Sequence, residues 1–306
     1  MARNDEALHV VMFPYFAFGH INPFVQLSNR LCAHGVRVSF LSAPGNISRI
    51  QSTMKLTPEA EIVPLPIPEI EGLPQGFDST ADMTPAMAEI LKQAIDLLQP
   101  QTSSLLSQLK PHFVIFDFAQ HWVPKVASEL GIKTLRFSIF ATISDAYVMV
   151  PPREKSNTID DLMRAPNGFP SDNNIALKEF EARDFLYVFM SFHGKPSVYE
   201  RVLECLNSCT AIANRSCIEM EGDQFVNSKL VAWDMRAGVE VKRREDSGYF
   251  SKEDVVEAVN TVMVEVEKEP GVSIRANQNR WRDFLLNKEI QNKYIADLVH
   301  GLKALA

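Results

Sequence analysis

Two patterns of hydrophobic and polar residues alternate along the first 140 positions of the chain. Short apolar runs are typical of strands buried on both faces of a parallel sheet, and apolar residues spaced three and four apart are typical of helices. The first run covers residues 8–13, and the helical pattern that follows it ends at Gly35. A second strand over residues 37–41 completes a βαβ unit, whose crossover we expect to be right-handed.

The same alternation continues beyond this unit. Thr84 and Pro85 predict an N-cap followed by a helix, and a further helix is predicted from Trp122 to Gly131. Strands are predicted at residues 60–63, 113–116, 133–139 and 210–214. A polar connection over residues 151–174 and two helices, at residues 180–192 and 198–206, precede the last strand. The pattern predicts an α/β fold with a Rossmann-like, doubly wound parallel sheet.

The pattern changes after residue 222. Helices are predicted at residues 225–235, 251–266, 274–286 and 290–305, with one short strand at residues 239–241. A segment with so little strand cannot build a second doubly wound domain. We therefore expect a domain of residues 1–222 and a mostly helical tail of residues 223–306.

Composition and charge narrow the classes of partner. The chain has 306 residues, of which 46% are hydrophobic, and a net charge of −7. Its basic cluster, residues 242–244, is followed at once by Glu245 and Asp246, which predicts a solvated turn. No basic stripe is available to neutralise phosphates, so nucleic-acid binding is not expected. The apolar run at residues 8–13 is too short for a signal core or a membrane span, and we expect a soluble, cytoplasmic protein.

The cysteines do not predict a metal site. They are Cys32, Cys205, Cys209 and Cys217, and they lack the spacing of paired metal ligands. Cys205 and Cys209 are one helical turn apart, which allows both to face the core as reduced thiols.

Two polar side chains are expected at the same edge of the predicted sheet. Gly19 and His20 follow the first strand, and Asp117 ends the strand over residues 113–116. Ligands of such sheets bind at the carboxyl ends of the strands. His20 is the candidate general base, because the positive end of a helix favours the neutral imidazole. A polar residue bound to the helix backbone is the alternative for His20, and a helix cap is the alternative for Asp117.

Two other histidines are weaker candidates. His121 lies one turn beyond Asp117 and is placed to touch a ligand, although a solvated or helix-packed histidine explains the position better. His193, next to Gly194, is a candidate for the lining of a cleft. Trp122 is expected in the core.

Three segments carry a resemblance to a known family. They are FAFGHINPF at residues 16–24, VIFDFAQHWVP at residues 114–124 and ANRSCIEMEG at residues 213–222. In combination they resemble the plant secondary-product UDP-sugar glycosyltransferases, most closely the branch that glycosylates flavonoid or anthocyanin glycosides. The resemblance extends through nearly all of residues 8–222, and the tail resembles the late C-terminal region of the family. It implies the GT-B fold, in which an acceptor-binding domain faces a donor-binding domain.

The resemblance also implies a reaction. A sugar would pass with inversion from a UDP-sugar to a hydroxyl of a small phenolic glycoside. His20 would remove the hydroxyl proton, and Asp117 would orient the imidazole. Gly19, His121 and His193 are the candidates for contact with the acceptor. The UDP-sugar is a co-substrate, and the resemblance implies no further cofactor and no metal.

Only the end of the family's donor-binding motif is present. The motif has an HCGWNS-like centre and ends on an acidic residue and a glutamine, here Asp223 and Gln224, which would bind the donor sugar. Glu221 and Gly222 lead straight into this pair, and the sequence has no HCG centre. The chain thus resembles a family member with a large internal deletion, and the alternative function is a catalytically silent protein that binds the acceptor. Uncovered surface between the domains would favour self-association.

Overall fold

The computed structural model describes residues 7–140, 142–149, 158–166, 169, 176–215, 231–232 and 235–306. The chain divides into two compact units. The first contains residues 1–139, 191–213 and 293–306, and the second contains residues 140–190 and 214–292. The boundary expected between residues 222 and 223 lies outside the described residues and stays a prediction.

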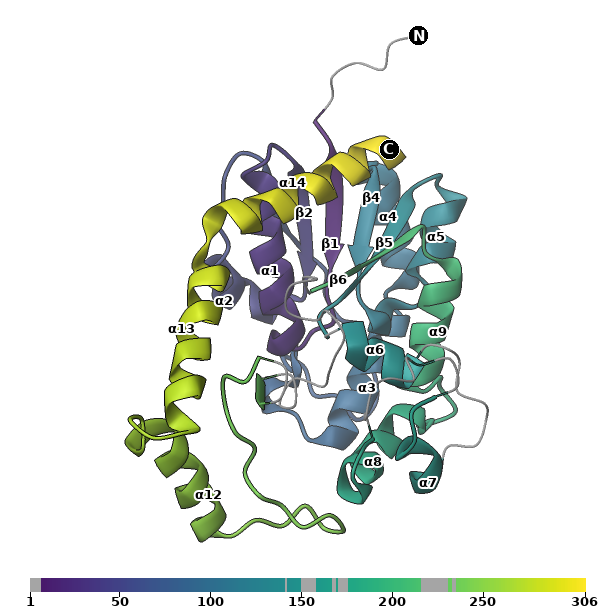
Figure 1. Cartoon of the computed structure of the whole chain (residues 1–306). Helices are drawn as coiled ribbons and strands as arrows, with labels where there is room; N and C mark the ends of the chain where they lie inside the picture. The colour runs from purple at the N-terminus through teal and green to yellow at the C-terminus, as the bar shows by residue number, and fades with distance from the viewer. Residues whose placement is uncertain are drawn as a thin grey trace. The chain divides into compact units, whose positions relative to one another are not determined.

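A six-stranded sheet forms the centre of the first unit (Figure 1). Its order is β3-β2-β1-β4-β5-β6, which is the order of a doubly wound Rossmann-like sheet. The strands are β1 (His9–Phe13), β2 (Arg37–Ser42), β3 (Ala60–Pro64), β4 (Phe113–Phe116), β5 (Lys133–Ser138) and β6 (Ala211–Asn214). The pairings of β1 with β2 and β4, of β2 with β3 and of β4 with β5 are parallel. The predicted fold class is confirmed.

Helices cover both faces of this sheet. Val10 and Met12 of β1 face one hydrophobic cluster, and Val11 and Phe13 face the other, as the alternation of a strand buried on both sides requires. The first cluster includes residues of α1 (Phe18–Cys32), α2 (Ile47–Gln51) and α14 (Lys288–Leu305). The second includes residues of α3 (Pro85–Asp96), α4 (Gln99–Leu109), α5 (Val123–Glu129) and α9 (Val198–Ser208).

The last helix packs on the sheet-containing unit. Val299 and Leu302 of α14 are buried in the same cluster as Val10 and Phe24. In Figure 1, α14 crosses in front of the upper ends of the strands, above α1. The C-terminal residues therefore belong to the core of the first unit.

The second unit contains helices joined by irregular segments in its described parts. Its helices are α6 (Thr142–Met149), α7 (Ile159–Leu162), α8 (Glu179–Phe185), α12 (Lys252–Val259) and α13 (Gly271–Leu286). The predicted capping residue Ser251 forms a capping box with Asp254. The basic cluster at residues 242–244 is exposed, as predicted, but the turn itself lies just after it, at residues 245–247.

The short strand predicted at residues 239–241 is wrong. The backbone there forms no strand. All six described strands belong to the single sheet, so this short apolar segment has no neighbouring strand with which to pair. The helix predicted at residues 225–235 falls mostly outside the described residues.

Candidate functional site

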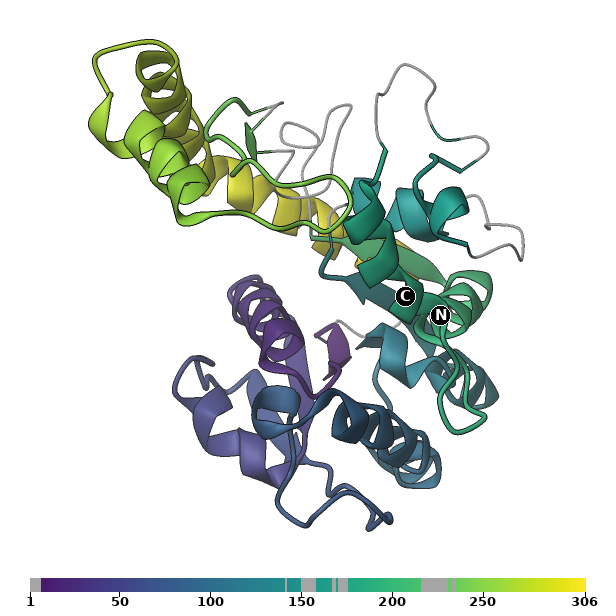
Figure 2. The ribbon, with the colours of Figure 1, turned by 90° about the horizontal axis from the view of Figure 1, so that it is seen from below.

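The candidate site lies where the strand order reverses, between β1 and β4. The last residues of these strands, Phe13 and Phe116, are partners in the parallel register. Asp117 follows β4 directly, and His20 lies in the first turn of α1, after a loop of four residues (14–17). Ligands of doubly wound sheets bind at this switch point, beyond the carboxyl ends of the strands. Figure 2 shows the ribbon from below, the side toward which β1 runs in Figure 1.

The structure brings His20 and Asp117 together. The Nδ1 atom of His20 lies 2.7 Å from Oδ2 of Asp117. The same carboxylate accepts hydrogen bonds from the backbone N–H of Tyr15 at 3.2 Å and of Phe118 at 2.7 Å. Three donors therefore fix the Asp117 carboxylate, and Nδ1 of His20 is the nitrogen that carries a proton. In the neutral ring, the basic nitrogen is then Nε2.

The pair shifts both pKa values toward the charged forms. Burial by itself would lower the pKa of His20, but the charge of Asp117 and the hydrogen bond to it raise this pKa above its ordinary value of 6.5. Burial would raise the pKa of Asp117, but His20 and the N–H groups of Phe118 and Tyr15 together hold it below 3.8. The position of His20 at a helix start predicted a preference for the neutral ring, and the adjacent carboxylate reverses that preference.

Two aromatic rings enclose the imidazole. The Tyr15 ring stands edge-on to His20 with 5.4 Å between centroids, and the Phe118 ring lies 5.6 Å from it. The hydroxyl of Tyr15 donates to the backbone oxygen of Ala88 at 3.4 Å. Burial, followed by the charges of Glu89 and Asp117, raises the pKa of Tyr15. Neither Tyr15 nor Phe118 was predicted as a site residue from the sequence, although each is within two residues of the end of a strand.

The other predicted residues do not join this pair in the described structure. Gly19 is exposed in the first turn of α1, with open space where a Cβ atom would lie. His121 contacts Arg201, with 2.9 Å between Nδ1 and Nη1. His193 is exposed in a tight turn and has a φ of 52°. Their roles toward the acceptor stay predictions.

The predicted donor pair, Asp223 and Gln224, lies outside the described residues. Within the described ranges, no group of three His, Cys, Asp or Glu side chains is arranged to hold a metal ion. None of the helices that the structure describes combines the length and the apolar character needed to cross a membrane. Trp122 is buried in the core, as predicted.

Comparison with solved structures defines the class of fold. The crystal structure of UGT89C1 of Arabidopsis thaliana matches with a TM-score of 0.61 over 97% of this chain and 100% of that chain, at 16% identity. This likeness and the sheet order place the chain among proteins with the GT-B fold of glycosyltransferases. No family model matches the chain.

Sequence comparison defines the family. The anthocyanidin-3-O-glucoside rhamnosyltransferase of Petunia hybrida is 36% identical, with 100% of this chain and 98% of that protein covered. A Glycine max protein named inactive UDP-glycosyltransferase 79A6 is 50% identical over 72% of this chain and 71% of its own length. The chain belongs to the plant UDP-glycosyltransferases, which are transferases.

The alignment with the Petunia protein is much longer than the chain. It extends over 464 positions, whereas the chain has 306 residues, so at least 158 positions (464 less 306) are gaps in this chain. Both ends of the relative are nevertheless covered almost completely, since the alignment includes 98% of its length.

Proposed function

We propose that this chain carries the acceptor-activating half of a UDP-sugar-dependent transferase that acts on a hydroxyl of a flavonoid or anthocyanin glycoside. The observation that carries the proposal is the 2.7 Å contact between His20 and Asp117 at the switch point of the sheet. Family membership supports the donor class, and the acceptor class agrees with the name of the Petunia relative.

In the proposed reaction, Nε2 of His20 takes the proton of the acceptor hydroxyl. Asp117 holds the proton on Nδ1 and stabilises the imidazolium that forms, the role of the carboxylate in a Ser-His-Asp triad. The acceptor oxygen then bonds to the anomeric carbon from the face opposite the leaving group. The bond from that carbon to the UDP oxygen breaks, and its electron pair leaves with UDP. Because the attack comes from the opposite face, the configuration of the anomeric carbon inverts. Neither metal nor further cofactor has a part in this proposal.

A second candidate is a catalytically silent protein that binds only the acceptor. The gap of at least 158 positions favours it, because a deletion of that size at residues 222–223 would remove most of the donor domain. The relative at 50% identity, which shares 72% of this chain, is itself named inactive. Transfer requires the anomeric carbon within about 3–3.5 Å of the acceptor oxygen, and that positioning depends on a grip on the pyrophosphate.

Calorimetry with UDP and UDP-glucose, together with mass spectrometry of product, distinguishes the two candidates. For the silent protein we expect no nucleotide binding tighter than about millimolar, no product, and saturable quenching of tryptophan fluorescence by a flavonoid glycoside. Micromolar affinity for UDP, or turnover that His20→Ala abolishes, would show a functional transferase. Absence of both nucleotide and flavonoid binding would reject both candidates. We also propose that the protein is located in the cytoplasm.

A further inference from the structure

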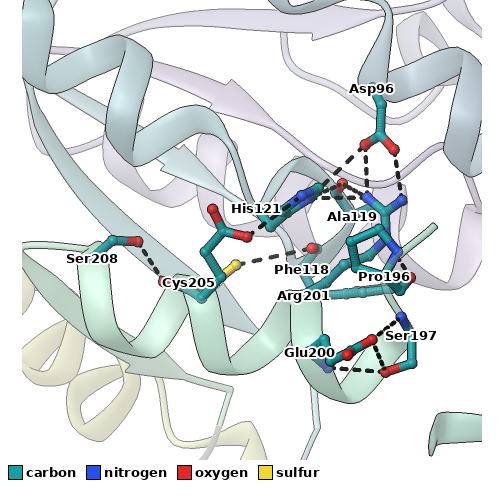
Figure 3. A network of polar contacts seen from close by, with 11 residues as sticks. Asp96, Phe118, Ala119, His121, Pro196, Ser197, Glu200, Arg201, Cys205 and Ser208 are labelled. Atoms are coloured by element: carbon teal, nitrogen blue, oxygen red, sulfur yellow. Dashed lines mark hydrogen bonds and ion pairs between the residues drawn. The ribbon is translucent and has the colours of Figure 1, made fainter. Parts of the chain in front are cut away.

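An arginine with almost no solvent exposure contacts the turn that follows Asp117. Arg201 of α9 is 1% exposed. Its guanidinium forms two hydrogen bonds with the carboxylate of Asp96, with Nη1 to Oδ1 at 2.7 Å and Nη2 to Oδ2 at 2.6 Å (Figure 3). This fork geometry fixes the plane and the direction of the guanidinium.

The same guanidinium holds two backbone carbonyls. Nη1 donates to the oxygen of Ala119 at 3.0 Å, and Nε donates to the oxygen of Pro196 at 3.2 Å. Pro196 directly precedes the capping box of α9, in which Ser197 and Glu200 exchange hydrogen bonds (Figure 3). Arg201 therefore ties the start of its own helix to the segment that contains Ala119.

That segment is the turn that begins at Asp117. Ala119 is the middle residue of the 3-10 turn Phe118–Gln120, whose N-cap is Asp117. The residues on either side of Ala119 are also held: Cys205 of α9 has its Sγ atom 3.9 Å from the oxygen of Phe118, and the Gln120 amide donates to the oxygen of Pro14 at 2.8 Å. The turn Phe118–Gln120 thus contacts both α9 and the loop of residues 14–17 that precedes α1.

His121 closes the arrangement. Its Nδ1 atom lies 2.9 Å from Nη1 of Arg201, and the positive guanidinium at this distance favours the neutral ring over an imidazolium. Burial, followed by the charge of Arg201, lowers the pKa of His121, although Asp96 and Glu204 oppose the shift. Asp96 balances the charge of Arg201, and the backbone oxygens of Ala119 and Pro196 accept hydrogen bonds from the same guanidinium.

We infer that Arg201 is a positioning residue, which holds the turn after β4 so that the carboxylate of Asp117 points at Nδ1 of His20. The inference rests on the proposed function of that pair. A buried ion pair of this kind gives little net stability over apolar residues. The specific consequence of the Arg201–Asp96 pair is geometric. Arg201 fixes the backbone carbonyl of Ala119, two residues beyond Asp117, and the intervening residue Phe118 donates its N–H to the carboxylate of Asp117.

The pKa of His20 reports this geometry in the whole chain, without any need for turnover. We would titrate the histidine side chains by NMR in the wild type, Asp117→Asn, Arg201→Lys and the double variant Asp96→Asn with Arg201→Met. The double variant removes both charges of the ion pair, because loss of one partner alone would leave the other charge unpaired and threaten folding. Arg37→Met is the control, since Arg37 pairs with Glu61 in the same unit but is half exposed.

Direct electrostatics and positioning predict opposite results. If Arg201 acts only through its charge, loss of that charge alone would raise the pKa of His20. In the double variant, where Asp96 is neutral too, the pKa would stay unchanged. Positioning predicts that the pKa of His20 falls toward 6.5 in the folded double variant, by at least half of the fall that Asp117→Asn causes. It predicts no change in the pKa of His20 in Arg37→Met. Arg201→Lys, which keeps the charge without the planar fork, should give an intermediate fall, and it decides the question if the double variant does not fold.

Two outcomes would overturn the inference. A fall in Asp117→Asn with no fall in the folded Arg201 variants rejects Arg201 as a positioning residue and leaves the proposed pair intact. An unchanged pKa of His20 in Asp117→Asn rejects the pair itself, and the role of Arg201 with it.

Discussion

The Nδ1 atom of His20 lies 2.7 Å from Oδ2 of Asp117, although the two residues are 97 positions apart in the sequence. The distance is short because β1 and β4 are neighbours in the sheet and end in register, with Phe13 opposite Phe116. Each residue then occupies the start of the element that follows its strand. The backbone N–H groups of Tyr15 and Phe118 complete the set of donors around the carboxylate.

This pair should make stability depend on pH in a defined window. The pKa of His20 in the folded chain is above 6.5, so its contribution is full below that value and is lost as pH rises through the folded pKa. The pKa of Asp117 is below 3.8, so its contribution is full above that value and is lost as pH falls through the folded pKa. Both contributions are present between pH 3.8 and 6.5.

Asp117→Asn should therefore lower the free energy of unfolding most within that window. We expect a larger loss at about pH 5.5 than at about pH 8.5, where the neutral imidazole gains less from the carboxylate. Urea denaturation at the two pH values measures the difference. Asp283→Asn, on an exposed ion pair of α13, is the control and should change stability by no more than about 0.5 kcal/mol at either pH. An equal loss for Asp117→Asn at both pH values would contradict the coupling.

A chimera tests the chemistry of the pair. If the segment missing from this chain is restored from the Petunia relative, we expect transfer activity with a flavonoid glycoside. His20→Ala in the chimera should reduce kcat by about 10²–10⁴-fold, because a general base typically contributes that much. Asp117→Asn should reduce it by a substantial part of that factor, since the imidazole loses its orienting carboxylate. Turnover of His20→Ala close to that of the parent chimera would remove His20 from the mechanism.

Much of the fold and part of the site were predictable because they depend on local patterns. Gly131 ends α5 with a φ of 69°, and Thr84 caps α3 by accepting from the N–H of Met87. Parallel strands of a doubly wound sheet end at one edge, so His20 and Asp117 could be placed at the same edge from their positions after two predicted strands, whereas their contact was implied only by the family resemblance.

The remaining features depend on contacts that a local pattern does not show. The helix α4 was not predicted, and its buried residues, Thr102 and Leu106, form no clear apolar stripe. Arg201 was not selected either, although it shares the buried face of α9 with Val202 and Cys205, a position where an arginine is unusual. Its partner Asp96 is on another helix 105 residues earlier, and only the tertiary fold joins them.

The second unit should favour self-association. Large apolar side chains are exposed on α12, on the π-helical segment Asn260–Val264 and on α13, including Met263 at 69% and Val264 at 66% exposure. Such surfaces tend to be covered by another polypeptide. We expect light scattering coupled to gel filtration to show oligomers of the wild type. The double variant Met263→Lys with Val264→Lys should form smaller oligomers, because it places charges on the exposed apolar surface. Asn292→Lys, at an exposed polar position, is the control. A monomeric wild type at about 50 μM would refute the prediction.

The final helix should be required for the stability of the sheet-containing unit. Leu302 of α14 is 1% exposed and belongs to the cluster formed with β1 and α1, whereas Leu305, three residues later, is 42% exposed. Leu302→Ala removes buried methyl groups and leaves a cavity, so it should lower the free energy of unfolding by about 2–5 kcal/mol. Leu305→Ala should change it by no more than about 0.5 kcal/mol, since its side chain is largely in water in both states. Urea denaturation followed by circular dichroism compares the two variants on the same helix. Equal effects would mean that α14 does not hold its place against β1 and α1 in solution, and that the cluster is stable without it.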